Sequence, residues 1–163
     1  GFCLVGSEMC IRDSIKEVAK SWFVARATVK EIDRINILQA SFLAMRRAIR
    51  KSGADVDLLL VDGKTPLKDY LGEQRCIVGG DDLCFCIAAA SILAKEERDA
   101  YMQRQAKKHP HWGFDTNVGY ATPVHKKMIE EHGVCDLHRR SFAPVANRVA
   151  QSPVQLEAPF EQS

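Results

Sequence analysis

Several kinds of segment are scarce or missing in this sequence. No run approaches the roughly 18 consecutive apolar residues that a membrane-spanning helix needs. Neither sign of charge dominates, because 23 Lys and Arg stand against 21 Asp and Glu. Any nucleic-acid binding must therefore come from local clusters of basic residues. Cys84 and Cys86 lack the two-residue gap and the partner pair of a zinc knuckle, which argues against a structural zinc motif.

The composition fits one soluble globular domain. The chain has 163 residues, 46% of them hydrophobic, and a mean hydropathy of -0.19. Six cysteines without a secretory signal indicate reduced thiols, so we expect a cytoplasmic protein, and we expect it to be a monomer. Between Lys95 and Arg148, ten Lys or Arg stand against seven Asp or Glu. Solvated helix faces explain this excess as well as a binding surface does.

The first residues do not resemble a natural start. The chain does not begin with Met, and residues 1–5 are too few and carry no positive charge, so they do not form a signal peptide. Residues 9–14, MCIRDS, resemble the translation of a transposon adapter used in DNA sequencing libraries. We therefore expect residues 1–14 to be non-native, residues 15–148 to form the domain and residues 149–163 to be a flexible tail. A natural but unremarkable N-terminal segment is the alternative.

Apolar spacing predicts a long helix in the first half of the chain. Thr28 and Glu31 have the spacing of a capping box, with Asp33 as a competing N-cap. Apolar residues, Leu38 among them, then recur at helical intervals up to Ile49, which predicts one buried face. Lys51-Ser52-Gly53 is a plausible C-terminal stop.

Short apolar runs predict strands after this helix. Consecutive aliphatic residues predict a strand over 57–61 that is buried on both faces, as in an α/β sheet. A polar loop over 64–75 precedes a second short strand at 76–78. Helices are expected from near Asp81 or Asp82, over 87–106 and over 122–132, with a loop beginning at Trp112-Gly113-Phe114.

Two aspartates lie where such runs meet glycine. Asp62 ends the aliphatic run in LLLVDG, and Asp81 follows Gly79-Gly80 at the start of a helix. Carboxylates delivered by a strand end and a helix start can hold hard divalent cations, an arrangement suited to phosphodiester chemistry. Turn formation by Asp62 and helix capping by Asp81 or Asp82 are the ordinary alternatives.

The order of several separated motifs resembles ribonuclease HII. The motifs are VDG, GGD, IAAASILAK, RD, GYAT, H and HRRSFAPV, and the resemblance runs from about Glu31 to Val145. It implies an α/β, ribonuclease H-like fold and an endonuclease that cleaves the RNA strand of DNA–RNA hybrids and single ribonucleotides in duplex DNA. Two Mg²⁺ or Mn²⁺ ions would serve the hydrolysis, which leaves 3′-hydroxyl and 5′-phosphate ends.

The resemblance also implies roles for five residues. Asp62 and Asp81 match metal-binding catalytic carboxylates, and Tyr120 matches the tyrosine that packs on the ribonucleotide and bonds its 2′-hydroxyl. Lys95 and Arg139 match positions that could contact phosphate. Arg98 and Asp99 are expected to form a structural ion pair instead.

The sequence departs from the family pattern in one important respect. The family's first strand carries adjacent Asp-Glu carboxylates and a Gly-Arg-Gly loop, and neither occurs here. We therefore expect an N-terminally truncated fragment that lacks the first strands of the sheet and half of the metal site, and that is nearly inactive. A non-catalytic module that binds hybrids is the main alternative, and a structural protein with a Cys/His metal site is a third.

Overall fold

The computed structural model describes residues 8–142 and 145–146, so the expected tail at 149–163 lies outside the described residues. It has two strands, β1 (Leu59–Asp62) and β2 (Gln74–Ile77). The helices are α1 (Glu8–Val18), α2 (Val29–Ser52), α3 (Gly80–Leu83), α4 (Phe85–Ala106), the 3-10 helix η1 (Pro110–Trp112), α5 (Phe114–Asn117) and α6 (Pro123–His132). The protein is thus α/β and mostly helical.

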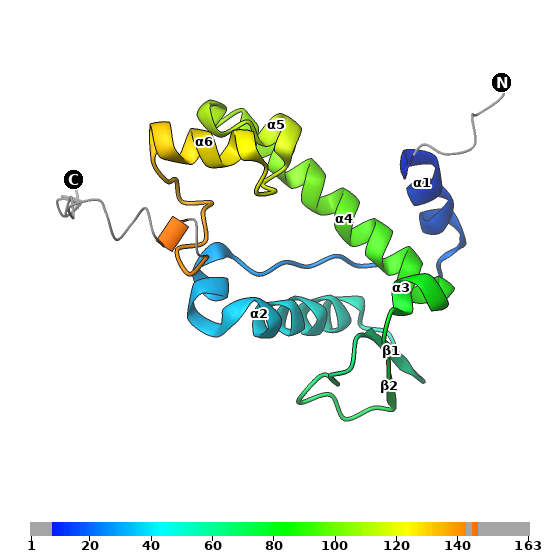
Figure 1. The fold of residues 1–163 in the computed structure, drawn as a ribbon. Helices are drawn as coiled ribbons and strands as arrows, with labels where there is room; N and C mark the ends of the chain where they lie inside the picture. The colour runs from blue at the N-terminus through cyan, green and yellow to red at the C-terminus, as the bar shows by residue number, and fades with distance from the viewer. Residues whose placement is uncertain (1–7, 143–144, 147–163) are drawn as a thin grey trace, which may run out of the picture.

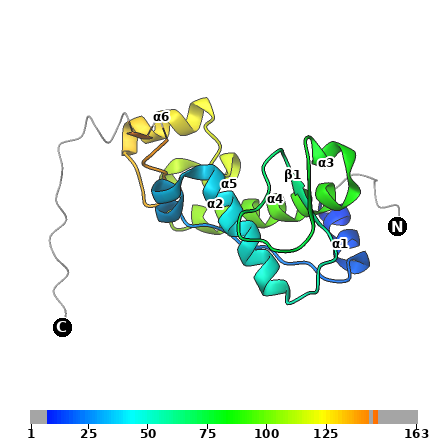
Figure 2. The same ribbon diagram turned by 90° about the horizontal axis from the view of Figure 1, so that it is seen from below.

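Helix α4 is the axis on which the other elements are arranged (Figure 1). Helices α1 and α3 and strand β1 pack against it near one end, and α5 packs near the other. Helix α6 contacts η1, so the elements after α4 form a group of their own at that far end. Figure 2 shows this group and the β1–α3 region at opposite ends of the molecule.

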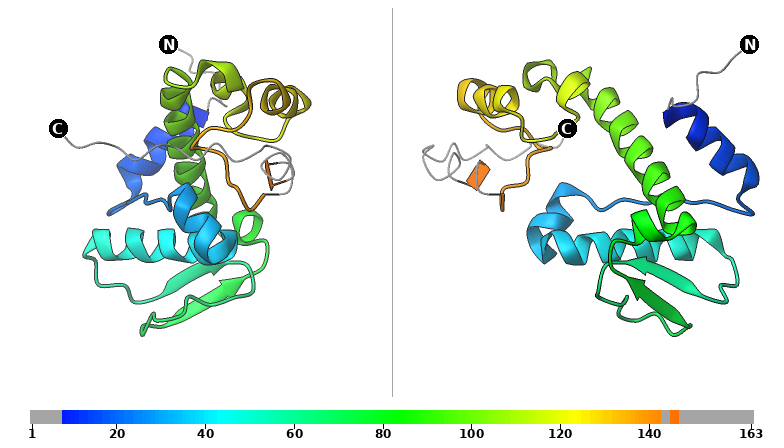
Figure 3. Two further views of the ribbon diagram at one scale, coloured as in Figure 1. Left: turned by 90° about the vertical axis from the view of Figure 1, so that its left-hand side faces the viewer. Right: turned by 45° about the vertical axis from the view of Figure 1, so that its right-hand side comes forward.

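The main core lies between α2 and the two-stranded sheet. Phe42 of α2, Val61 of β1 and Leu67 of the connecting loop are buried together, with Met45 and Ile49 packed beside them. Figure 3 shows α2 lying across one face of the sheet. The loop is fixed by Gln74, whose side chain accepts a hydrogen bond from the Leu67 N–H and donates one to its carbonyl.

The predicted boundaries of α2 are confirmed, but its interior differs. Thr28 and Glu31 form the capping box, and Gly53 ends the helix in the left-handed conformation. A kink at Asn36, with φ of 66°, divides the helix, and the Asn36 side chain caps the second part by accepting from Gln39 N–H. Because the kink rotates the apolar stripe, Leu38 is exposed rather than buried.

Two other predictions about elements are wrong. The first strand is not buried on both faces, because the described sheet has only two strands and Leu59 and Leu60 stay partly exposed. Residues 110–117 form η1 and α5 instead of an open loop, because Pro110 starts one turn and the Gly113 carbonyl accepts from Thr116 and Asn117 in the next. The predicted helices over 87–106 and 122–132 are confirmed.

The segment Glu8–Val18 is helical and packs on α4, where Arg12 lies 3.7 Å from Glu96. That residues 1–14 are non-native stays a prediction. Within the described residues, no helix combines the length and apolar character needed to cross a membrane. The structure describes five of the six cysteines and shows no disulfide among them, and the reduced state of all six stays a prediction.

Candidate functional site

The end of β1 and the start of α3 bring two aspartates into the same region. The strands are parallel, so their carboxyl ends meet at one edge, where Asp62 pairs with Ile77 and the Gly63 N–H donates to the Ile77 carbonyl at 2.8 Å. The chain then turns through Gly79 into α3. There the Gly80 N–H donates to Asp62 Oδ1 at 2.9 Å, which places the Asp62 carboxylate beside the helix turn that carries Asp81.

Glycine at position 80 makes this approach possible. A Cβ added there would lie 3.3 Å from Asp62 Oδ1 and 2.6 Å from Ile87 Cδ1, so a side chain at this position would displace the end of the Ile87 side chain and crowd the Asp62 carboxylate. Gly80 is itself buried, whereas Asp62, Asp81 and Asp82 are exposed. The three carboxylates therefore face solvent at one edge and offer the oxygen ligands that hard divalent cations prefer.

The carboxylate edge is sparsely built. In the part of the chain that the structure describes, the cluster of at least three potential metal ligands lies elsewhere, at His109, Cys135 and Asp136. Large apolar side chains around the edge are open to solvent: Val78 is 70% exposed, Leu83 75% and Phe85 82%. The candidate metal ligands at this edge are thus Asp62 and Asp81, and the apolar side chains around them are not covered by other described residues.

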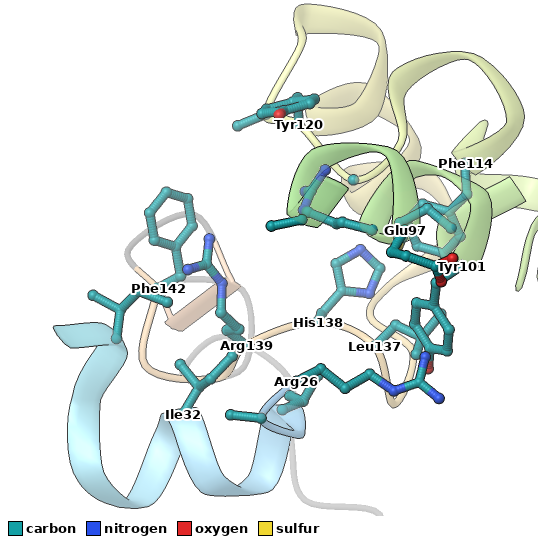
Figure 4. Close-up of a pocket in the computed structure, with 18 of the residues that line it drawn as sticks. Arg26, Ile32, Glu97, Tyr101, Phe114, Tyr120, Leu137, His138, Arg139 and Phe142 are labelled. Atoms are coloured by element: carbon teal, nitrogen blue, oxygen red, sulfur yellow. The ribbon is translucent and has the colours of Figure 1, made fainter. Parts of the chain in front are cut away.

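A cavity of about 970 Å³ lies at the other end of α4. It is lined by residues 24–27, by helices α2, α4 and α6, by residues 119–121 and by the described residues 137–139, 142 and 145, and both Tyr120 and Arg139 contribute to its wall (Figure 4). Among its described lining residues, Glu97 is the sole acidic one. The cationic ones are Arg26, Arg47, Lys51, Arg98, Arg104, Lys126 and Arg139.

Arginine and aromatic side chains are paired around this cavity. Each guanidinium lies over a ring, a geometry that holds the arginine in place while leaving its N–H groups available to anions. Figure 4 shows two of these pairs on facing walls. The distances to the ring centroid are 4.4 Å for Arg26 on Tyr101, 4.5 Å for Arg98 on Tyr120 and 4.7 Å for Arg139 on Phe142.

The loop that presents Tyr120 is held by Asn117. The buried Asn117 side chain donates to the Trp112 carbonyl at 2.7 Å and accepts from the Gly119 N–H at 2.8 Å. The backbone between them is left-handed, with φ of 41° at Val118 and 80° at Gly119. Tyr120 is therefore fixed by its backbone while its side chain is 52% exposed. Nothing in the sequence pattern indicated this role for Asn117.

The segment that carries Arg139 is anchored to α2. Asp33, which the sequence offered as a helix cap, instead accepts hydrogen bonds at 3.0 Å from the backbone N–H groups of Arg140 and Ser141. Burial alone would raise the Asp33 pKa, but these donors and the Ser141 hydroxyl outweigh it and lower the pKa. Sequence reasoning missed this anchor, because it joins residues more than a hundred positions apart.

A second ionic contact fixes the start of α2 beside the cavity. Arg47 Nη1 lies 3.0 Å from Glu31 Oε2, and the Thr28 N–H also donates to the same oxygen at 2.8 Å. The hydrogen bonds from Arg47 and then from the Thr28 backbone lower the Glu31 pKa to about 2. Glu31 is therefore ionised at neutral pH and joins the two parts of α2 across the kink at Asn36.

Stacked aromatic and imidazole rings back the cavity. Phe114 is 2% exposed and contacts the rings of His125 and His138, which stack on each other at 5.3 Å. His138 Nδ1 accepts from the Cys135 N–H at 2.9 Å. Burial, and then the neighbouring His125, lower the His138 pKa to about 4, so this imidazole is neutral at pH 7.

The five residues that the resemblance singled out fall into three places. Asp62 and Asp81 lie at the carboxylate edge, Tyr120 and Arg139 at the cavity, and Lys95 on α4 between them, exposed to solvent. From Phe85 at the start of α4 to Arg98, which contacts Tyr120, the helix rises about 20 Å. The structure therefore joins the members of each pair but leaves the two pairs apart. Arg98 also forms the predicted ion pair with Asp99, at 3.2 Å.

Known proteins are similar to this chain over most of its length. The family model for ribonuclease HII matches residues 8–145. This chain belongs to the ribonuclease HII family. A ribonuclease HII from Endomicrobium trichonymphae is 43% identical over 142 residues, covering 87% of this chain and 68% of the relative. The corresponding values for the Dechloromonas aromatica protein are 47% over 141 residues, 86% and 71%, and for the Sphingopyxis alaskensis protein 50% over 125 residues, 77% and 63%.

The comparisons confirm the predicted ribonuclease HII family. The matched region accounts for 63% to 71% of the length of these three relatives, so each of them has a part with no counterpart in the match. The family match begins at residue 8 and ends at Val145, which spans both the carboxylate edge and the cavity. Both regions thus belong to the ribonuclease HII part of the chain.

Proposed function

We propose that this chain is the part of a ribonuclease HII that supplies two metal-binding carboxylates and much of the substrate surface. The enzyme would cleave the RNA strand of DNA–RNA hybrids and single ribonucleotides in duplex DNA, leaving 3′-hydroxyl and 5′-phosphate ends. The observation that carries the proposal is the hydrogen bond from Gly80 to Asp62, which sets the strand-end carboxylate beside the helix turn of Asp81.

Mg²⁺ or Mn²⁺ fits the donors at this edge. Asp62 Oδ1 is engaged by the Gly80 N–H, so Oδ2 is the oxygen that Asp62 would direct at an ion, and the exposed Asp81 carboxylate would supply a second ligand. Both donors are hard oxygens, as these cations require. When bound, a pair of such ions would activate a water and neutralise the departing 3′ oxygen.

The cavity supports a role in holding the substrate. Tyr120 would pack against the ribose and bond its 2′-hydroxyl, the group that distinguishes RNA from DNA. This role requires the cavity and the carboxylate edge to lie closer together in the whole enzyme than they do in this chain alone. Arg139 would contact phosphate from the cavity wall, and Lys95 would do so from the exposed face of α4. The excess of cationic side chains in this cavity favours a polyanionic ligand.

The chain by itself would have little nuclease activity. Two carboxylates are too few to hold two divalent ions against bulk water, because each ion takes several oxygen ligands. The exposed apolar side chains at the same edge support a further covering segment in the whole enzyme. We propose that such a segment completes the ribonuclease H-like sheet and brings the missing carboxylates.

A chimera tests this proposal. Residues 15–163 would be joined to the N-terminal part of the Dechloromonas aromatica relative. From the family pattern, we expect that part to carry the Asp-Glu pair and the Gly-Arg-Gly loop. We expect Mg²⁺- or Mn²⁺-dependent cleavage of a duplex containing one ribonucleotide, with products bearing 3′-hydroxyl and 5′-phosphate ends. A folded chimera without cleavage, or cleavage that persists in the presence of EDTA, would contradict the proposal.

A further inference from the structure

A cluster of three potential metal ligands, a thiol, an imidazole and a carboxylate, lies away from the carboxylate edge. His109 follows the C-terminal end of α4, and Cys135 and Asp136 follow α6. One ligand atom from each of these three side chains lies within 4.8 Å of the other two. His109 Nε2 lies 3.4 Å from Asp136 Oδ1.

These distances suit one tetrahedral ion. With Zn–N and Zn–O bonds of about 2.0–2.2 Å, a histidine nitrogen and a carboxylate oxygen on the same zinc lie about 3.3 Å apart. The 3.4 Å between His109 and Asp136 already matches that edge. The cysteine sulfur needs no more than a small side-chain adjustment to reach the same centre, because its distance to both atoms is below 4.8 Å.

Hydrogen bonds and ring contacts also hold the residues of the cluster in position. The Cys135 N–H donates to His138 Nδ1 at 2.9 Å, and the His138 N–H donates to the Cys135 carbonyl at 3.1 Å, so the turn that carries Cys135 and Asp136 is closed on both sides. The His109 ring meets Trp112 and Phe114 edge-on, which restricts its rotation. The Asp136 side chain is 80% exposed, so the site is open to solvent on that side.

We propose that His109, Cys135 and Asp136 form a binding site for a transition-metal ion of the zinc class, completed by water. The mixed N, S and O donors exclude Mg²⁺ as the preferred ion, because Mg²⁺ takes oxygen ligands. On binding, the Cys135 thiol gives up its 3.1 Å contact with His138 Nδ1, releases its proton to solvent and coordinates as thiolate, while the Cys135 N–H keeps its hydrogen bond to His138 Nδ1.

Such an ion would join two segments next to the cavity. It would link the turn after α4 to the turn that precedes Arg139, and so would hold that arginine and the His138 ring in place. The site is chemically independent of the proposed Mg²⁺ or Mn²⁺ ligands at Asp62 and Asp81. A test of this metal site therefore does not depend on the nuclease proposal and does not decide it.

Cobalt(II) titration of the full 163-residue chain tests the site. Co²⁺ is a spectroscopic substitute for Zn²⁺, and its bond to thiolate gives charge-transfer absorption in the near ultraviolet. We expect one equivalent to bind with this absorption, Zn²⁺ to displace it, excess Mg²⁺ to leave it unchanged, and Zn²⁺ to raise the Tm by several degrees.

Variants separate this site from the other thiols. Cys135→Ser should abolish the charge-transfer absorption, whereas the matched controls Cys76→Ser and Cys86→Ser, at exposed positions, should keep it. Should Cys135→Ser fail to fold, Asp136→Asn changes an exposed side chain and should weaken Co²⁺ binding at least about tenfold. Absence of thiolate absorption in the unmodified chain, or its loss in the controls but not in Cys135→Ser, would overturn the proposal and leave a His109–Asp136 ion pair only.

Discussion

The two ends of α4 differ in how many contacts hold the functional side chains in place. At the cavity, buried rings, side-chain caps and anchors such as Asp33 on Ser141 fix the positions of Tyr120 and Arg139. At the carboxylate edge, one hydrogen bond from Gly80 orients Asp62, and the apolar side chains nearby are exposed. The cavity wall is thus firmly held within this chain, whereas the carboxylate edge has few contacts among the described residues, and we propose that a further segment completes it.

Removing the charge of Asp62 should have the largest effect of all, a strong loss of cleavage with little loss of substrate binding. In the chimera, Asp62→Asn should lower kcat/KM by about a thousandfold, because an ion ligand worth several kcal/mol to the transition state is lost. The asparagine oxygen can still accept from Gly80 N–H, so the fold is kept. Affinity for a hybrid duplex, measured by fluorescence anisotropy, should change less than about twofold.

Asp82→Asn is the control for that experiment, because it alters a neighbouring exposed carboxylate in the same helix turn. We expect it to lower kcat/KM by less than about tenfold, because it removes only a weak electrostatic stabilisation of the ions. Equal losses for Asp62→Asn and Asp82→Asn would show that general negative charge, and not a specific ligand, matters at this edge.

The same substitution should lower stability strongly at the cavity end and hardly at all at the carboxylate edge. Phe114→Ala should lower the free energy of unfolding by about 3–5 kcal/mol, because the ring is 2% exposed and its loss leaves a cavity among the histidines. Phe85→Ala removes a ring that is 82% exposed and should change stability by less than about 0.5 kcal/mol. Urea denaturation measures both values, and equal losses would contradict the contrast in packing.

The histidine cluster should make stability depend on pH. The His138 pKa is about 4 in the folded chain and near 6.5 when unfolded, so the unfolded chain binds the extra proton between these values. This contribution is fully present above pH 6.5 and is lost as pH falls towards 4. Thermal unfolding between pH 7 and 4 should show the fall. His138→Asn, whose amide oxygen can replace Nδ1 as acceptor, should flatten it, and an unchanged slope would contradict the assignment.

A second titration lies in a separate pH range. The Glu31 pKa is about 2 when folded, against 4.5 when unfolded, so its stabilising contribution is lost only as pH falls from about 4.5 towards 2. Measurements between pH 7 and 5 therefore report on the histidine cluster with little contribution from Glu31.

The smallest expected effects concern single phosphate contacts. Arg139→Ala should weaken binding of a hybrid duplex several-fold, since one contact to the backbone is lost, and should reduce the slope of log K against log salt by about 1. Arg75→Ala, at an exposed site on β2 with Glu73 as its partner, is the matched control and should leave the slope unchanged. An equal reduction in both variants would mean that the cavity is not the binding surface.

Local signals in the sequence predicted most of the elements. The Thr28–Glu31 box and Gly53 set the bounds of α2 correctly, and Thr122 and Gly133 those of α6, because caps act through neighbouring backbone groups. The kink at Asn36 escaped notice, because the helical apolar spacing continues across it. Strand burial was overestimated, because it depends on how many strands and helices cover the strand, which the run of aliphatic residues does not encode.

The site was predicted only in part, and for a similar reason. The glycine turn before Asp81 indicated that a strand end and a helix start could meet, and Gly80 does bring Asp62 there. The pairing of Arg26 with Tyr101 and the bonds from Ser141 to Asp33 join distant positions that have no periodic relation in the sequence. The His109, Cys135 and Asp136 cluster likewise forms only once α6 packs on η1, which brings the turn after α6 beside the turn after α4.

Mn²⁺ binding to Asp62→Asn, Asp81→Asn and the double variant tests most directly whether these two carboxylates share one ion. Free Mn²⁺ would be followed by electron paramagnetic resonance during titration of the 163-residue chain. If both side chains hold the same ion, each single variant weakens the binding of the same one equivalent at least about tenfold, and the double variant abolishes it. Single variants that leave the affinity unchanged, or that each remove a different one of two equivalents, would contradict a shared ion.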